Sequence, residues 1–194
     1  MEDSFSILSG IIKNRRSTKP AQMNGNIIPD EQVEQLLELA DWAPTHGNTE
    51  PWRFIVYAGA QAKAFCLQHA ELYKSNTKVE NFLQANYDKI LHNGDKVSHI
   101  LITVMQRGKL PKVPVQEEEA ATAAAIQNIL LGATALNIAS FWSTGGLAHH
   151  PAMKTLLGLH DEDVVMGILF LGYADITPTG KRIIPLTEKV KWIS

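Results

Sequence analysis

Apolar residues recur along this chain at two spacings, one typical of helices and one typical of buried strands. Helical spacing starts near the beginning, where Phe5 and Leu8 follow Asp3 or Ser4 as a candidate N-cap. It returns after Pro29, which suits the first turn of a helix and is followed by two acidic residues that suit a helix N-terminus. The same pattern predicts further helices over residues 60–74, 77–92, 117–139 and 151–157.

Nearly continuous runs of apolar, often β-branched residues predict buried strands. Three such runs cover residues 52–57, 97–105 and 164–173, and a shorter strand is expected around Phe141. These strands alternate with helices only irregularly, and they are too few for a doubly wound parallel sheet. The sequence therefore predicts an α+β fold with a central mixed, mainly antiparallel sheet covered by helices.

The most apolar window runs from Ala120 to Trp142 and is long enough to raise the question of a membrane span. Polar residues such as Gln127 and Asn137 interrupt it, and three glutamates precede it. We therefore interpret the window as a buried helix. Because it is apolar around most of its circumference, it should lie between partners, and its alanines would let another backbone approach closely.

Composition and charge are those of an ordinary globular domain, with 194 residues of which 45% are hydrophobic. A formal net charge of −2 gives no electrostatic reason to expect nucleic acid or an anionic membrane as a partner. The acidic start of the chain carries no apolar run, so no secretory signal is expected. The single cysteine, Cys66, excludes an internal disulfide, and a cytoplasmic location is expected.

Common catalytic motifs are absent from the sequence. No two of the seven histidines have the spacing of zinc ligands on a helix, so no metal site is expected. The sequence also has no glycine-rich dinucleotide fingerprint, Walker A motif or Gly-x-Ser-x-Gly elbow. Cys66 is expected to be a packing residue, and Glu117–Glu119 to favour a helix start. No side chain is therefore assigned a catalytic role, and an enzyme of this kind would depend on a bound cofactor.

One short stretch suggests such a cofactor. Arg15-Arg16-Ser17-Thr18-Lys19 sets three cations and two hydroxyls at the end of the first helix. This stretch can hold an anionic group by charge-assisted hydrogen bonds. Taken alone, it is better explained by a solvated helix end, because cations are favourable beside a helix C-terminus.

Four segments, taken together and in order, resemble the FMN-dependent nitroreductases, in particular their small single-domain members of the YdjA type. The first two are the basic stretch at 15–19 and the loop 43–51 that leads into the strand after Trp52. The third is the alanine-rich helix with residues 141–146 behind it, and the fourth is the Gly-x-Leu-x-Leu-Gly-Tyr strand at 167–173. Together they cover nearly the whole chain.

The resemblance implies one nitroreductase-like domain over residues 1–194, an α/β/α sandwich that forms an intertwined homodimer. It implies bound FMN as the cofactor and NADH or NADPH as the co-substrate. The implied reaction is ping-pong hydride transfer to the flavin and then to a nitroaromatic, a quinone or a similar small acceptor. Neither a nucleic acid nor a membrane is expected as a partner.

The resemblance also implies roles for individual residues. Arg15 and Ser17 match positions that grip the flavin phosphate and ribityl chain, and Lys19 matches one near the pyrimidine edge, where a cation raises the reduction potential. The loop at 45–48 matches a segment that reaches the flavin held mainly by the other subunit, and the basic tail at 181–182 resembles one that closes over the phosphate. The residues expected to bind the cofactor are Arg15, Arg16, Ser17, Lys19, Thr45, His46, Asn48, Trp142, Ser143, Thr144, Gly145, Gly146, Lys181 and Arg182.

Three residues depart from the family pattern. Glu50 stands where glutamine is usual, Trp42 stands where some members carry arginine, and Pro20 stands where an aromatic residue or alanine is usual. Two alternatives to turnover with NAD(P)H therefore stay open. One is a flavin-binding protein of the same fold with another flavin reaction, such as dehalogenation or flavin breakdown, or with no turnover. The other is a scaffold without a cofactor that dimerises through the alanine-rich helix.

Overall fold

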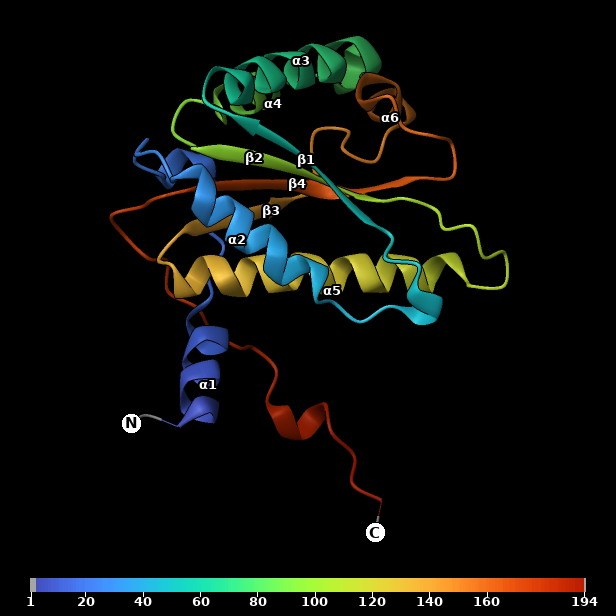
Figure 1. The fold of residues 1–194 in the computed structure, drawn as a ribbon. Helices are drawn as coiled ribbons and strands as arrows, with labels where there is room; N and C mark the ends of the chain where they lie inside the picture. Colours follow the sequence, from blue (N-terminus) through green and yellow to red (C-terminus); the bar gives the residue numbers. More distant parts are fainter. Residues whose placement is uncertain (1–2, 194) are drawn as a thin grey trace.

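The computed structural model describes residues 3–193 and contains one four-stranded sheet with helices on both faces (Figure 1). Neighbouring strands in the sheet are antiparallel throughout. Among the described residues, parallel pairing is limited to an isolated bridge between Ser17 and Ser140. The strands, in the spatial order β1-β2-β4-β3, are β1 (Trp52–Ala58), β2 (His99–Met105), β4 (Val164–Gly172) and β3 (Ala139–Ser143).

Five of the helices cover the sheet as two layers (Figure 1). One face carries α3 (Ala60–Asn76), α4 (Gln84–His92) and α6 (Pro151–Leu157). The other face carries α2 (Asp30–Asp41) and α5 (Val115–Ala135). This arrangement confirms the predicted α+β class and the sheet covered by helices.

The central strand β2 shows why the layers form, because it is buried at every position. Successive side chains of a strand point to opposite faces. Leu101 accordingly packs into the cluster shared with α2 and α5, whereas Ile100 and Ile102 pack into the cluster shared with α3 and α6. Burying one such side chain fully stabilises the fold by about 1.5–3 kcal/mol, so this strand ties both layers together.

The helix predicted over 117–139 spans Val115–Ala135 in the structure, and only its predicted last residue, Ala139, belongs to a strand. Asn137 has a φ of 56°, a left-handed conformation that an α-helix cannot continue through. The Ile138 N–H donates to the Ala133 carbonyl at 2.7 Å, which reverses the chain at the helix end. Strand β3 then begins at Ala139, earlier than its aromatic residues suggest.

The helix predicted over 77–92 is wrong in its first half. Residues 79–81 form a single 3₁₀ turn, and the α-helix begins only at Gln84. Val79 and Leu83 are 92% and 58% exposed, and only Phe82 between them packs against Tyr73, so few apolar contacts support a helix there. The Leu83 N–H instead donates to the Tyr73 hydroxyl at 3.2 Å.

Helix α5 is buried against the sheet and α2 on one side only. Its opposite side presents a stripe of partly or fully exposed, mostly small residues at helical spacing: Ala120, Ala123, Ala124, Gln127 and Leu131. Within residues 3–193, no helix combines the length and the apolar character that a bilayer crossing requires. The chain itself therefore supplies a partner for one side of this apolar helix and leaves the other open.

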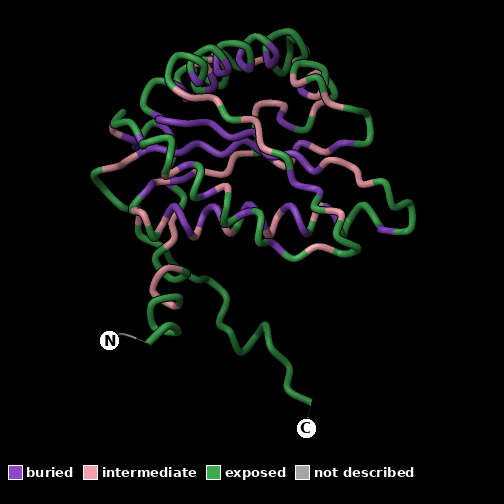
Figure 2. The backbone as a smooth tube through the Cα atoms, viewed as in Figure 1, coloured by how far each residue is buried: buried purple, intermediate pink, exposed green. Residues whose placement is uncertain are grey.

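The first helix, α1 (Ser4–Asn14), stands off the body of the protein (Figure 2). Asp3 is its N-cap and accepts a hydrogen bond from the Ser6 N–H at 3.0 Å. Although its sequence is amphipathic, none of its residues is buried, and Phe5 is 78% exposed. The tail after β4 also leaves the body, with Trp192 90% exposed. Exposed apolar side chains of this kind are typical of a surface that another molecule covers.

Cys66 is buried on α3 beneath the sheet, which confirms its predicted role as a packing residue. Burial raises the pKa of its thiol to about 12, so almost no reactive thiolate forms at neutral pH. We expect an aromatic disulfide reagent to modify native protein on the order of a thousandfold more slowly than a small free thiol at pH 7.5. In guanidinium, the single cysteine should react fully. Fast modification of protein that keeps its circular dichroism would contradict this burial.

Candidate functional site

The basic turn after α1 is held beside the start of β3. The Thr18 N–H donates to the Ser140 carbonyl at 2.9 Å, and Ser17 pairs with Ser140 as an isolated parallel bridge. Thr18 is buried, whereas Ser17 and Lys19 on either side of it are exposed. The alternation of a short strand thus directs the Ser17 side chain away from the core, on the side of β3 that leads to Trp142.

The turn and β3 together line a hollow of about 400 Å³. Its lining unites the first and third of the segments singled out from the sequence, with two residues of α5 between them. The Trp142 indole is fixed because its Nε1–H donates to the Met166 carbonyl at 3.0 Å. The residues that line this hollow are Arg15, Ser17, Gln127, Leu130, Trp142 and Thr144.

Glycine is required behind that indole. A Cβ on Gly167 would lie 2.3 Å from Trp142 Nε1, and the residue has a φ of 143°. Any side chain would therefore displace the ring. Gly167, the first residue of the family-like strand, thus leaves the room that the Trp142 ring needs in the hollow.

The donors around this hollow are suited to a phosphorylated, ring-containing ligand. Within residues 3–193, the side chains of Arg15, Ser17 and Lys19 have no hydrogen-bond acceptor and no ion-pair partner at contact distance. Arginine and hydroxyl donors bind phosphate well, and the indole and Leu130 supply apolar surface for a ring. The chemistry of the donor set therefore fits the phosphate and ring of a flavin mononucleotide.

Arg16 has a different environment from Arg15. Its guanidinium donates to the carbonyl oxygens of Lys13 at 2.6 Å and Arg15 at 2.9 Å, so it caps the end of α1. Gly180 in the tail packs against it, since a Cβ there would lie 2.6 Å from Arg16 Cζ. Arg16 also lines a second hollow, of about 750 Å³, between α1 and the tail. Its predicted contact with a cofactor stays a prediction.

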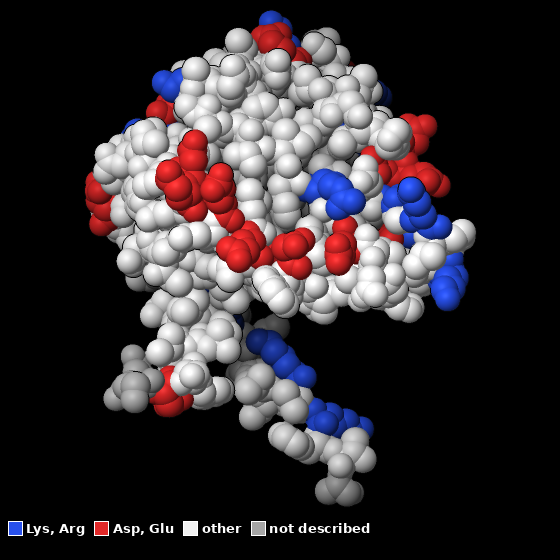
Figure 3. All heavy atoms as spheres, in the orientation of Figure 1, with Lys and Arg blue, Asp and Glu red and all other residues white. Residues whose placement is uncertain are grey.

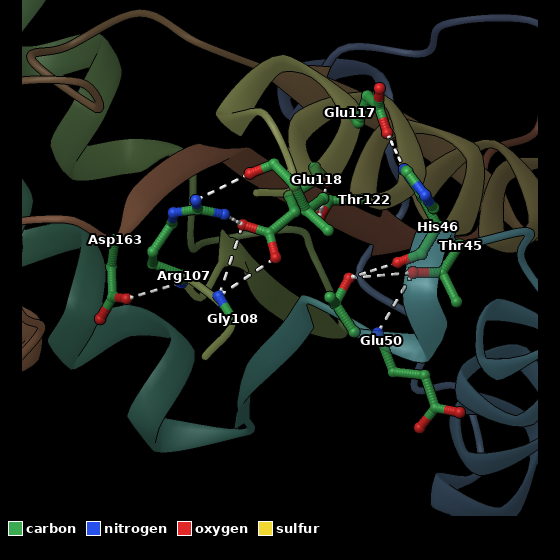
Figure 4. Close-up of polar contacts among 11 residues, drawn as sticks. Thr45, His46, Glu50, Arg107, Gly108, Glu117, Glu118, Thr122 and Asp163 are labelled. Atoms are coloured by element: carbon green, nitrogen blue, oxygen red, sulfur yellow. Dashed lines mark hydrogen bonds and ion pairs between the residues drawn. The ribbon is translucent and has the colours of Figure 1, made fainter. Parts of the chain in front are cut away.

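The loop at 45–50 lies beside the first turn of α5, which carries Glu117 (Figure 4). Its Thr45 hydroxyl accepts from the Glu50 N–H at 3.2 Å and contacts the Thr49 hydroxyl at 3.1 Å. His46 pairs through Nδ1 with Glu117 in the first turn of α5. Asn48 and Glu50 adopt φ values of 51° and 43°, a backbone strain that is common in loops which contact ligands.

A buried ion pair supports this loop from behind (Figure 4). Arg107 pairs with Glu118, whose carboxylate also accepts from the Gly108 N–H at 3.1 Å. The Arg107 N–H donates to Asp163 at 3.1 Å, and its guanidinium donates to the Val113 carbonyl at 2.7 Å. The loop after β2 is thereby fixed to α5.

The 45–50 loop and the loop after β2 both line a hollow of about 520 Å³, which includes Gly47, Asn48 and Arg53. The sequence analysis missed the ion pair behind it. Glu117, Glu118 and Glu119 look alike in sequence, and only the packing shows that Glu118 is the buried one, with 1% of its surface exposed. The one sequence signal for this ion pair was Arg107, an arginine in the loop before an acidic helix start.

The two groups of candidate residues do not meet within one chain. The 45–50 loop contacts Glu117, whereas the hollow beside the basic turn includes Gln127 and Leu130 of the same helix. A rise of 1.5 Å per residue separates these levels of α5 by roughly 15–20 Å. Each group therefore lines its own hollow, and a single site containing both requires a second chain.

The remaining candidate residues lie at or near the surface. Ser143 is half-buried at the end of β3, Thr144 and Gly145 are exposed, and Gly146 turns the chain with a φ of 65°. Lys181 and Arg182 are exposed on the tail, where lysine and arginine gather (Figure 3). Trp42 is 82% exposed at the end of α2, and its effect on a substrate stays a prediction.

Outside these hollows, the described residues form neither a working hydrolase triad nor a metal site. Ser98, His99 and Asp30 are joined by hydrogen bonds of 2.9 Å in the order of a hydrolase triad. The Ser98 hydroxyl is only 1% exposed and accepts from the Ile28 N–H at 2.7 Å, so it cannot reach a substrate. In the part of the chain that the structure describes, no group of three or more His, Cys, Asp or Glu residues could hold a metal ion.

Comparison with known proteins shows which family the chain resembles in sequence and fold. The model of the nitroreductase family matches residues 12–173. The chain is similar to YfhC of Bacillus subtilis (strain 168), provisionally named an NAD(P)H nitroreductase, with 29% identity over 95% of this chain and 93% of YfhC.

Two solved structures share the fold. A nitroreductase-like family protein from Bacillus cereus has a TM-score of 0.82 and 28% identity, over 100% of this chain and 99% of that chain. A provisionally assigned nitroreductase from Desulfovibrio desulfuricans, in complex with FMN, has a TM-score of 0.75 and 20% identity, over 100% and 99% of the two chains.

The adjacent glutamates at the start of α5 provide a matched test of the buried ion pair. Glu118→Gln leaves the Arg107 guanidinium buried without a counter-charge, which should lower the free energy of unfolding by about 3 kcal/mol or more. Glu117→Gln removes an exposed contact with His46 and should cost at most about 1 kcal/mol. Urea unfolding followed by tryptophan fluorescence measures both. Equal losses in the two variants would show that burial does not distinguish them.

Proposed function

The chain belongs to the nitroreductase family, and from that premise we propose that it is an FMN-dependent NAD(P)H oxidoreductase whose sites lie between the chains of a homodimer. The observation that carries the proposal is the hollow in which Arg15 and Ser17 lie beside Trp142 and Thr144. Residues far apart in the sequence, chosen for their resemblance to flavin-binding positions, line one cavity. A single domain over residues 1–194 and a cytoplasmic location are part of the proposal.

Arg15 and Ser17 would hold the phosphate of FMN, and Lys19 would lie toward the ring. Bound FMN would supply the ability to accept a hydride from a nicotinamide and to pass the electrons on. The protein would supply binding, orientation and a site that excludes water. Lys19 would also stabilise negative charge that gathers at the edge of the ring. No side chain is required to act as an acid, a base or a nucleophile.

A second copy of the chain is the partner that best explains the exposed apolar surface. α1, the tail and the outer stripe of α5 lie on the same side of the sheet, away from α3 and α6 (Figure 1). Phe5, Ile183 and Trp192 are 78%, 84% and 90% exposed there. A twofold dimer would cover these elements with the same elements of the partner. It would also bring the 45–48 loop of one chain toward the basic turn of the other.

The electron donor is proposed to be NADH or NADPH, and the acceptor a nitroaromatic, a quinone or a similar small oxidant. The chain's similarity to YfhC, named for NAD(P)H, supports the donor. In a ping-pong reaction the oxidised nicotinamide leaves before the acceptor enters, so a single site beside the flavin would serve both molecules in turn. Glu50 and Trp42, both exposed near the loop, are placed to influence which acceptors enter.

Removal of the proposed phosphate ligand tests the cofactor. Arg15→Ala should weaken FMN binding by about 10- to 100-fold, because a hydrogen bond to a charged group contributes roughly 1.5–3 kcal/mol. Lys13→Ala removes the same charge two residues away and should leave the affinity nearly unchanged. Quenching of flavin fluorescence during titration of FMN-free protein gives both dissociation constants.

Three results bear on the proposal as a whole. Protein that is purified yellow and bleaches with NADH or NADPH in the absence of oxygen supports it. Protein that binds FMN but oxidises neither nucleotide with menadione or nitrofurazone favours the alternative of another flavin reaction. Colourless protein that cannot be reconstituted with FMN contradicts the proposal.

Mixed dimers test whether two chains build each site. Arg15→Ala damages the phosphate side of a site, and Asn48→Ala damages the loop that the other chain supplies. Each variant alone should have little NADPH oxidase activity at limiting FMN. After the two are unfolded together and refolded, random pairing leaves about a quarter of all sites with both sides intact, so activity should return to that level. No recovery, with dimers formed, would contradict a shared site.

A further inference from the structure

A buried histidine is bonded to the turn that follows β3. His69 lies on α3 with 3% of its surface exposed, and its ring packs against Phe65 with the centroids 5.7 Å apart. Its Nε2 is hydrogen-bonded to the carbonyl oxygen of Gly146. A carbonyl only accepts, so Nε2 carries the proton. Burial lowers the pKa of His69 below its ordinary value, and the ring is therefore neutral at pH 7.

The turn fits closely against this histidine. A Cβ on Gly146 would lie 2.7 Å from His69 Nε2 and 2.9 Å from Ile90 Cδ1. Gly146 and Leu147 have φ values of 65° and 66°, and the second is an unfavourable conformation for a branched residue. Such a conformation persists only where surrounding contacts determine it. The hydrogen bond from His69 to Gly146 is one of the contacts that hold this conformation.

The hydrogen bonds of the turn are divided between its two ends. The Gly146 carbonyl is taken by His69, and the Gly145 carbonyl accepts from the Ala148 N–H at 3.3 Å. The N–H groups of Gly145 and Gly146 have no acceptor among residues 3–193. Gly145 is exposed and Gly146 is half-buried, so neither residue is enclosed in the core. The protein thus binds the carbonyl oxygens and leaves the N–H groups for an external acceptor.

We propose that His69 is a positioning residue for the flavin: by holding the Gly146 carbonyl, it fixes the turn so that the Gly145 and Gly146 N–H groups face the bound ring. This inference rests on the proposed function and on the expectation, implied by the family resemblance, that Trp142 to Gly146 bind the cofactor. Fixed N–H donors stabilise an electron-rich ring without reorganising when it is reduced. His69 would then raise both the affinity for FMN and its reduction potential without touching it.

Another buried histidine of the same chain offers a matched control. His99 is 2% exposed and bonded to Asp30 at 2.9 Å, but it is on β2 and contacts neither the turn nor the basic stretch. His69→Phe and His99→Phe each remove a buried imidazole and its hydrogen bonds while keeping a planar ring. His69→Gln keeps a donor near the position of Nε2. Comparison of the three separates the bond to Gly146 from a general loss of packing.

The experiment measures FMN affinity by fluorescence quenching and the midpoint potential of bound FMN by dye-coupled reductive titration. His69→Phe should bind FMN about tenfold more weakly, as expected for one lost hydrogen bond, and its flavin should have a lower potential than wild type. His69→Gln should recover most of both changes. His99→Phe should unfold at a lower urea concentration, with affinity and potential unchanged. If His69→Phe does not fold, His69→Asn, whose amide is too short to reach the carbonyl, is measured with the same expectation.

Wild-type affinity and potential in the His69 variant would overturn the inference. The same would follow if His99→Phe lowered both as much as His69→Phe. Failure of the proposed function looks different, because wild-type protein would then bind no FMN, and the inference would fall with it. Binding by wild-type protein, together with a selective loss in His69→Phe, supports both.

Discussion

Helix α5 sets the spacing on which the candidate site depends. One side of this helix is buried against the sheet and α2, so its position in the chain is fixed. Its first turn holds the 45–50 loop through His46, and its second half forms part of the hollow beside Arg15. A rigid helix keeps these two groups roughly 15–20 Å apart. In the proposed dimer, each chain would supply one part of each of two sites, and the exposed outer stripe of α5 is where the second copy would lie.

Buried polar contacts hold two loops that carry or support candidate residues. Glu118 and Arg107 fix the loop after β2 behind the 45–50 loop, and His69 holds the Gly146 carbonyl behind the turn after β3. Glu118 and His69 are almost completely buried, so leaving either group unsatisfied would cost free energy, and each contact favours one backbone arrangement. Glu118 and His69 act on the backbone of these loops and need not touch a reactant themselves. This is consistent with a protein that binds and orients a cofactor.

Local signals in the sequence predicted most of the fold. Runs of apolar residues located the strands, and Pro151 and Gly158 gave α6 the same bounds in the sequence and the structure. The helix over 77–92 was predicted too long, because the pattern of apolar residues does not reveal that Val79 and Leu83 are exposed. The basic stretch was found by composition, but its place beside Trp142 depends on pairing with Ser140, which is distant in sequence. For the same reason, neither His69 nor Glu118 could be distinguished from its equivalents.

Mass spectrometry under native conditions tests most directly whether two chains and two flavins make the functional unit. Purified protein reconstituted with FMN should appear as a dimer that carries two FMN molecules, and any monomer released from it should carry none. This follows because Arg15 and the 45–48 loop line separate hollows within each chain. A monomer that retains one FMN as tightly as the dimer does would contradict a site shared between chains.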